Sequence, residues 1–197
     1  MRQAARLVVT VAAFGLLVTG CTDDPAPVET TPASTPSPTP SLSPTPTPAA
    51  PTPPQRPEAM STNDEAGAVA AAQYFMGDLY VYAYASGDAT ELAHLSDDEC
   101  SFCNNVLTSV AAMSTDGESS HGSPATFSDA YGTTITPGTR FTATMNATQG
   151  AIERRDADGS VIDTSEGGRY TLHFAIAWDQ DWTILEVDAT PVDGADN

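Results

Sequence analysis

The chain has 197 residues, and its 26 acidic side chains outnumber its 7 basic ones, giving a formal net charge of −19 at pH 7. Because binding to phosphate groups needs a basic footprint, the composition argues against nucleic acid as a partner and against direct adsorption to anionic lipid headgroups. The acidity favours solubility, and a basic or cationic partner is the alternative.

The N-terminal twenty residues have the pattern of a secretory signal peptide. A basic start precedes an apolar run over residues 7–18, which is too short to span a bilayer core that needs about 20 residues. The Leu-Val-Thr-Gly-Cys run at residues 17–21 resembles the lipobox of bacterial lipoproteins. This resemblance implies that residues 1–20 are removed and that Cys21 receives a diacylglycerol with acyl chains such as palmitate. The lipid would hold the protein on the extracytoplasmic face of the cell membrane.

A segment rich in proline, threonine and serine follows at residues 21–57. It has almost no large apolar side chains, so it cannot bury a core, and we expect a disordered linker. Its prolines favour an extended polyproline II conformation that reaches at most about 110 Å. The remaining residues, 58–197, are long enough for a single domain with a core of its own.

Helical periodicity predicts that this domain begins with a long amphipathic helix over residues 63–86. Thr62 and Glu65 fit a capping box at its start, and Gly87 is a plausible stop. Gly77 lies inside the helix at a cost of up to about 1 kcal/mol relative to alanine, which indicates close backbone packing or a bend.

Two further capping boxes predict two more helices. Asp88 with Glu91 precedes a short helix, and Ser96 with Glu99 opens a helix over residues 97–113. The acidic residues in the first turn of the latter would interact favourably with its dipole.

The second half of the domain alternates between apolar and polar residues, as half-buried strands do. We predict strands at residues 125–135, 139–149, 169–178 and 182–189, with turns at 156–159 and 167–168. Helices followed by an antiparallel meander imply an α+β fold, in which the N-terminal helices pack on one face of a curved antiparallel sheet of about four strands.

This order of elements resembles the cone-shaped folds of ketosteroid isomerases and nuclear transport factor-type domains. The helical half is also similar to a family of uncharacterised lipoproteins from high-GC Gram-positive bacteria. The matching residues are Tyr74-Phe75, Leu79-Tyr80, Tyr82-Ala83-Tyr84, Gly87-Asp88, Leu95-Ser96 and Cys100-Ser101-Phe102-Cys103. The resemblance implies a cellular location and an architecture but no activity, because the cone fold hosts enzymes, binding proteins and scaffolds.

Cys100 and Cys103 form a C-x-x-C motif. Positions i and i+3 of a helix lie within the Cα spacing of a disulfide, and disulfides persist outside the cytoplasm. We therefore predict a structural disulfide. The alternative is thiol–disulfide exchange, which favours a positively charged setting after a strand, whereas here the acidic residues 97–99 precede the motif.

Aromatic residues crowd the end of the first predicted helix. Tyr82 falls on its apolar stripe and is expected in the core. Tyr80 and Tyr84 lie one turn apart on a neighbouring face and form a candidate interaction surface, since amphipathic aromatics suit interfaces. Simple packing at the rim of the fold is the alternative.

No catalytic residue, metal ligand or cofactor is predicted. His94, His121 and His173 have no partner at the spacing of metal ligands, and no G-x-S-x-G, H-E-x-x-H or P-loop pattern is present. His173 is expected to face outward.

We therefore expect a non-enzymatic binding or interaction domain at the cell envelope, anchored to the membrane through lipid on Cys21, with an envelope protein or a small ligand as partner. One alternative is a ketosteroid-isomerase-like enzyme, which would need an ionisable group such as Asp129 in a cavity between helix and sheet. The other is thiol–disulfide exchange through Cys100 and Cys103. The oligomeric state is left open.

Overall fold

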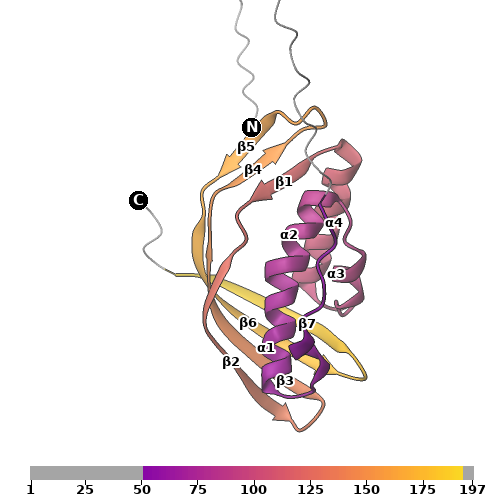
Figure 1. Ribbon diagram of the computed structural model, residues 1–197, viewed down its shortest axis with the longest axis vertical. Coiled ribbons are helices and arrows are strands. Elements are labelled where there is room, and N and C mark those ends of the chain that lie inside the picture. The colour runs from indigo at the N-terminus through magenta and orange to yellow at the C-terminus, as the bar shows by residue number, and fades with distance from the viewer. Residues whose placement is uncertain (1–50, 193–197) are drawn as a thin grey trace, which may run out of the picture. The chain divides into compact units, whose positions relative to one another are not determined.

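The computed structural model describes residues 51–192, which belong to one compact unit (Figure 1). The expected signal peptide, the lipidation at Cys21 and most of the expected linker lie outside these residues. A short 3-10 helix, η1 (Glu58–Ser61), opens the domain. The other helical segments are α1 (Glu65–Gln73), η2 (Tyr74–Leu79), α2 (Tyr80–Ser86), α3 (Thr90–His94) and α4 (Ser101–Asp116).

The first three of these, α1, η2 and α2, run on without a break and form the long helix that the periodicity predicts. Its N-cap is Asp64 rather than Thr62, because the Asp64 carboxylate accepts a 2.8 Å hydrogen bond from the Gly67 amide. The predicted capping box is therefore wrong. The Glu65 carboxylate instead accepts hydrogen bonds from the Thr134 amide and hydroxyl, at 2.9 and 3.0 Å, and ties the helix to a strand. Gly87 ends the helix at a φ of 76°, as predicted.

The middle of this helix, η2, is a π-helix. Gly77 lies within it, and a Cβ there would come 2.9 Å from Cε2 of the Phe127 ring. Close packing thus explains the glycine. The wider turn changes the phase of the residues that follow, since π-helical turns hold more residues than α-helical ones. Tyr82 accordingly lies only partly buried, with its hydroxyl 3.4 Å from Asp88, and not in the core as expected.

Helix α4 begins at Ser101, four residues later than the sequence predicts. The reason is that the chain before it pairs with a strand: the Ile184 amide donates to the Leu95 carbonyl, and the Asp97 amide donates to the Ile184 carbonyl. The acidic residues 97–99 therefore precede the helix and do not form its first turn. Cys100 is the N-cap.

A four-stranded antiparallel sheet carries the core, and it confirms the predicted α+β fold. Its strand order is β2-β3-β6-β7. The strands are β2 (Thr126–Thr136), β3 (Arg140–Gln149), β6 (Gly168–Trp178) and β7 (Trp182–Pro191). The side chains on its inner face are buried against the helices, as the alternation predicts: Phe141, Ala143, Met145, Leu172, Phe174 and Ile176.

A second, three-stranded sheet has the order β1-β4-β5 and was not predicted. Its strands are β1 (Ser119–Gly122), β4 (Ile152–Arg155) and β5 (Val161–Ser165). Figure 1 shows the strands curving around one side of the long helix, with β1 beside α2 and the four-stranded sheet beside α1. The two sheets meet where β3 leads into β4 and β5 leads back to β6. At this bend a Cβ on Gly167 would overlap the carbonyl oxygen of Gln149, so the two chains can cross closely only at a glycine.

The last residues assigned to the linker touch the domain. The Tyr74 hydroxyl donates to the Pro54 carbonyl, and Arg56 forms ion pairs with Glu91 and Asp181. The contacts of the domain therefore begin before the expected boundary at residue 57, because a proline-rich chain can still dock through its carbonyl groups and through a charged side chain.

Candidate ligand-binding site

A cavity of about 200 Å³ lies between the long helix and the four-stranded sheet. Met76 and Tyr80 of the helix form one wall, and Leu172 and Tyr170 of β6 line the other side. Phe102 closes it from α4, where its ring stacks on that of Tyr80 with 6.4 Å between centroids. The lining is thus mainly apolar and aromatic, as in sites for small molecules.

A second cavity of about 130 Å³ adjoins the first. Tyr80, Val81 and Gln149 line both, so they mark the boundary between the two. The second cavity extends beneath Tyr84 toward β1 and β4, where Ser120 and Ile152 contribute to its lining. We call the two cavities together the aromatic trough.

The structure brings together the two tyrosines that the sequence singles out. The ring centroids of Tyr80 and Tyr84 lie 4.8 Å apart, and both residues line the second cavity. Burial, and then the neighbouring Tyr84 and Tyr170, raises the pKa of Tyr80 well above its usual value. The Tyr80 hydroxyl is therefore neutral at physiological pH and can both donate and accept hydrogen bonds.

The lining of the trough contains no carboxyl, imidazole, guanidinium or amino group. Its polar groups are tyrosine and serine hydroxyls and the amide of Gln149. Asp129, the group named for an isomerase-like enzyme, is exposed and lies outside the lining. Its carboxylate accepts hydrogen bonds from Ser128 and from Asn146 at 3.1 and 3.0 Å, within an irregularity of β2. The lining thus offers a ligand neutral hydrogen bonds and apolar contact.

The Sγ atoms of Cys100 and Cys103 lie at disulfide distance, with the Cα atoms 5.3 Å apart, as their spacing predicts. Both residues are fully buried. The Cys103 amide donates to Cys100 Sγ, so the pair also caps α4. The pair fixes the turn that carries Phe102 into the trough. Burial and the acidic residues before it are unfavourable for thiol–disulfide exchange, which needs access and a stabilised thiolate.

The histidines lie apart from the trough. All three are exposed: His94 on α3, His121 on β1 and His173 on β6. His173 faces outward as expected, with its Nδ1 3.1 Å from the Thr144 hydroxyl. Between residues 51 and 192, no three His, Cys, Asp or Glu side chains are grouped as ligands for a metal ion.

Sequence reasoning missed most of the trough. Tyr170 lies in the predicted strand at residues 169–178 and Phe102 in the cysteine motif, but neither pattern connects these residues with Tyr80. Gln149 gives no signal, because only the bend between the sheets places it beside the helix. Gly77 signals that some group packs closely on the helix, but the sequence does not identify this group as Phe127, which also lines the first cavity.

Residues 45–188 match a family of unknown function (DUF6318), and the chain belongs to this family. No curated protein matches the sequence. None of the helices within residues 51–192 has the length and hydrophobicity to cross a bilayer.

Two solved structures are similar to the domain. One is the intermembrane space region of chloroplast protein ARC6, at 15% identity and a TM-score of 0.45, covering 61% of this chain and 95% of that one. The other is an NTF2-like protein with a cystatin-like fold from Novosphingobium aromaticivorans, at 16% identity and a TM-score of 0.34, covering 59% and 77%. Similarity at this level carries no conclusion about function.

Proposed function

We propose that the protein is a binding domain held at the outer face of the cell membrane by lipid on Cys21, and that its aromatic trough holds a small, neutral, mainly apolar ligand. The observation that carries this proposal is a trough lined by aromatic rings, without a charged group, beside the neutral hydroxyl of Tyr80. Burying such a ligand removes apolar surface from water at no cost in desolvated charge.

The shape of the trough favours a slender ligand over a bulky one, since two small cavities adjoin at Tyr80 and Gln149. Tyr80 and Gln149, the polar residues that line both cavities, suit a ligand with one polar group between apolar parts. The acidic net charge of the chain disfavours an anionic ligand further.

The experiment uses the full chain in its own membranes and benzophenone, a neutral photoreactive probe. We expect light to attach the probe to residues that line the first cavity, with Met76 a favoured target, as mapped by peptide mass spectrometry. Ala189 lies on the rim of this cavity, and Ala189→Trp should fill it. The yield of adduct should fall roughly tenfold, which corresponds to about 1.4 kcal/mol of lost binding.

The control is Thr190→Trp, because adjacent residues of a strand point to opposite faces. This variant should leave the yield unchanged, and benzophenone-4-carboxylate should label the cavity far less than the neutral probe. Equal labelling by the charged probe, or equal yields from both tryptophan variants, would contradict the proposal.

A further inference from the structure

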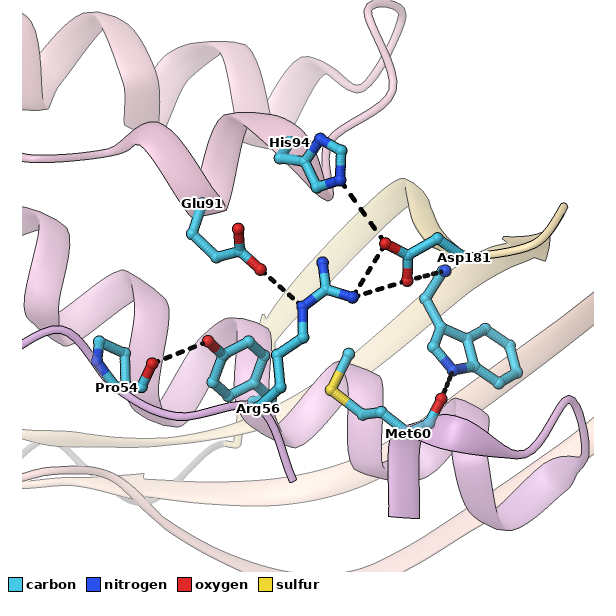
Figure 2. A network of polar contacts seen from close by, with 8 residues as sticks. Pro54, Arg56, Met60, Glu91, His94 and Asp181 are labelled. Carbon is cyan, nitrogen blue, oxygen red and sulfur yellow. Dashed lines mark hydrogen bonds and ion pairs between the residues drawn. The ribbon is translucent and has the colours of Figure 1, made fainter. Parts of the chain in front are cut away.

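Arg56 connects three parts of the chain that lie far apart in the sequence (Figure 2). Its Nε donates a 2.6 Å hydrogen bond to Glu91 on α3. Its Nη1 donates to both carboxylate oxygens of Asp181, at 2.8 and 2.9 Å, in the turn between β6 and β7. We call the linker the tether from here on. One guanidinium therefore joins the end of the tether to helix α3 and to the turn between β6 and β7.

The neighbouring residues support this contact. The Tyr74 hydroxyl donates a 3.2 Å hydrogen bond to the Pro54 carbonyl, two residues before Arg56. Pro57 has a φ of −62° and a ψ of 140°, as in polyproline II. Proline restricts the free chain as well as the docked one, so docking a proline-rich segment loses less conformational entropy than docking a flexible one. We call residues 54–57 the strap.

The strap and the anchor that follows it at Met60 are held very differently. Just after it, Met60 is 5% exposed, and its carbonyl accepts a 2.8 Å hydrogen bond from the indole of Trp182, which is 1% exposed. The side chains of Arg56, Glu91 and Asp181 are 36%, 41% and 39% exposed. Ion pairs this exposed contribute little and are screened by salt, whereas the buried anchor at Met60 is not.

We propose that the strap is a reversible latch: Arg56 releases the tether from α3 and from the β6–β7 turn while Met60 stays anchored. Closed, the latch fixes the point at which the tether leaves the domain. Open, it lengthens the tether by about 3.1 Å for each residue released and lets the domain turn about Met60. The latch responds to whatever weakens exposed ion pairs, such as salt or a pull on the tether.

The charge balance at the latch is set by a few groups around Arg56. His94 lies on the far side of Asp181, with its Nε2 3.6 Å from the carboxylate, and adds positive charge when protonated. Glu91 and Asp181 contact Arg56, and His94 contacts Asp181. Tyr74 lies close enough to Glu91, Arg56 and Asp78 for their charges to shift its pKa, which burial raises. Carboxylates are the acceptors, so the latch is closed at neutral pH.

The test measures backbone order by ¹⁵N relaxation in the full chain, held in detergent micelles. In the wild type, the amides of Gln55 and Arg56 should have order parameters of about 0.85, as in rigid backbone. In Arg56→Gln they should fall below about 0.6, while those of Met60 and Ser61 stay high. About 1 M NaCl, where the Debye length is about 3 Å, should lower them in the wild type too.

Two further variants complete the test. Arg56→Lys keeps the charge but cannot reach both carboxylates with a planar fork, so it should give intermediate values. Arg169→Gln removes an exposed arginine of β6 and should change nothing at residue 55. The proposal is overturned if the wild-type strap is already disordered, if Arg56→Gln leaves it ordered, if Met60 loosens equally, or if Arg169→Gln has the same effect.

Discussion

Asp181 accepts hydrogen bonds from Arg56 of the strap, and this contact makes the free energy of unfolding depend on pH. Burial opposes its ionisation, but hydrogen bonds from Arg56 and from the Trp182 amide outweigh burial and lower its pKa below the usual value. Because the folded pKa lies below that of the unfolded chain, about 3.9, Asp181 stabilises the fold above that pH. This contribution is lost as the pH falls through the folded pKa.

We therefore predict that Asp181→Asn lowers the free energy of unfolding at pH 7 and reduces the difference in stability between pH 7 and pH 3. Urea unfolding of the full chain at the two pH values measures both. Glu166→Gln, at an exposed residue between β5 and β6, is the control and should behave like the wild type. If Asp181→Asn kept the full acid sensitivity, its carboxylate would not be the group responsible.

The disulfide is a second feature at this scale, and its effect on stability should be modest. Cross-linking a loop of so few residues stabilises a fold by only about 2 kcal/mol in the chain-entropy model. We predict a loss of this size when Cys100 and Cys103 are both replaced by alanine, as measured by urea unfolding of the oxidised wild type and the variant.

Because both sulfurs are buried, dithiothreitol should reduce the native protein slowly. Rapid reduction with turnover of insulin disulfides would instead support thiol exchange.

At the scale of the elements, the bend between the two sheets depends on Gly167. An alanine there would overlap the Gln149 carbonyl oxygen, whereas a Cβ on Gly150, at the same bend, would meet only Ser123 Cβ at 3.7 Å. We predict that Gly167→Ala costs about 1–3 kcal/mol through overpacking. Gly150→Ala should change stability by no more than about 0.5 kcal/mol. Thermal unfolding of the two variants side by side is the measurement, and similar losses would show that the close crossing is not what requires glycine.

The elements that the sequence predicts well are those with a buried face. Residues 139–149 and 169–178 alternate so regularly because every second side chain packs under the long helix. Strands β4 and β5 carry no such alternation: Ile152–Arg155 is short and mixed, and Val161–Ser165 is exposed throughout. Their pairing depends on the hairpin that extends β3 and β6, which periodicity does not encode.

The start of α4 and the phase of the long helix depended on contacts distant in sequence. Ser96 and Glu99 satisfy the local rule for a capping box, but pairing of Leu95 and Asp97 with Ile184 holds the chain extended past them. The π-helical turn at Tyr74–Leu79 likewise has no local signal beyond Gly77. Tertiary contacts override local preference at both places.

At the scale of the whole molecule, the candidate site is assembled from stretches that lie far apart in the sequence. Tyr80, Gln149 and Tyr170 come together only because the sheets curve over the helix, so the sequence could name the tyrosines of the helix but not their surroundings. Cys21 in the sequence supports the proposed location at the membrane, and the lining of the trough supports a neutral apolar ligand. The proposal needs both.

We predict that Cys21→Ala releases the protein from the membrane. Without a thiol to receive diacylglycerol, the chain should lack the lipid in its intact mass and should no longer sediment with membranes, since the anchor would be gone. Fractionation with mass spectrometry measures both. Substituting Ser101, an exposed residue of α4 far in sequence from the lipobox at residues 17–21, by alanine should leave both unchanged. Unaltered mass and membrane retention in Cys21→Ala would refute lipid anchoring.

The most direct measurement of the central claim is the content of the trough in the native protein. The full chain would be isolated from its own membranes as wild type, Ala189→Trp and Thr190→Trp, extracted with organic solvent and analysed by mass spectrometry. The account predicts a neutral, mainly apolar compound that the wild type and Thr190→Trp retain in equal amounts and that Ala189→Trp loses. Identical extracts from all three, or a compound carrying a charge, would contradict it.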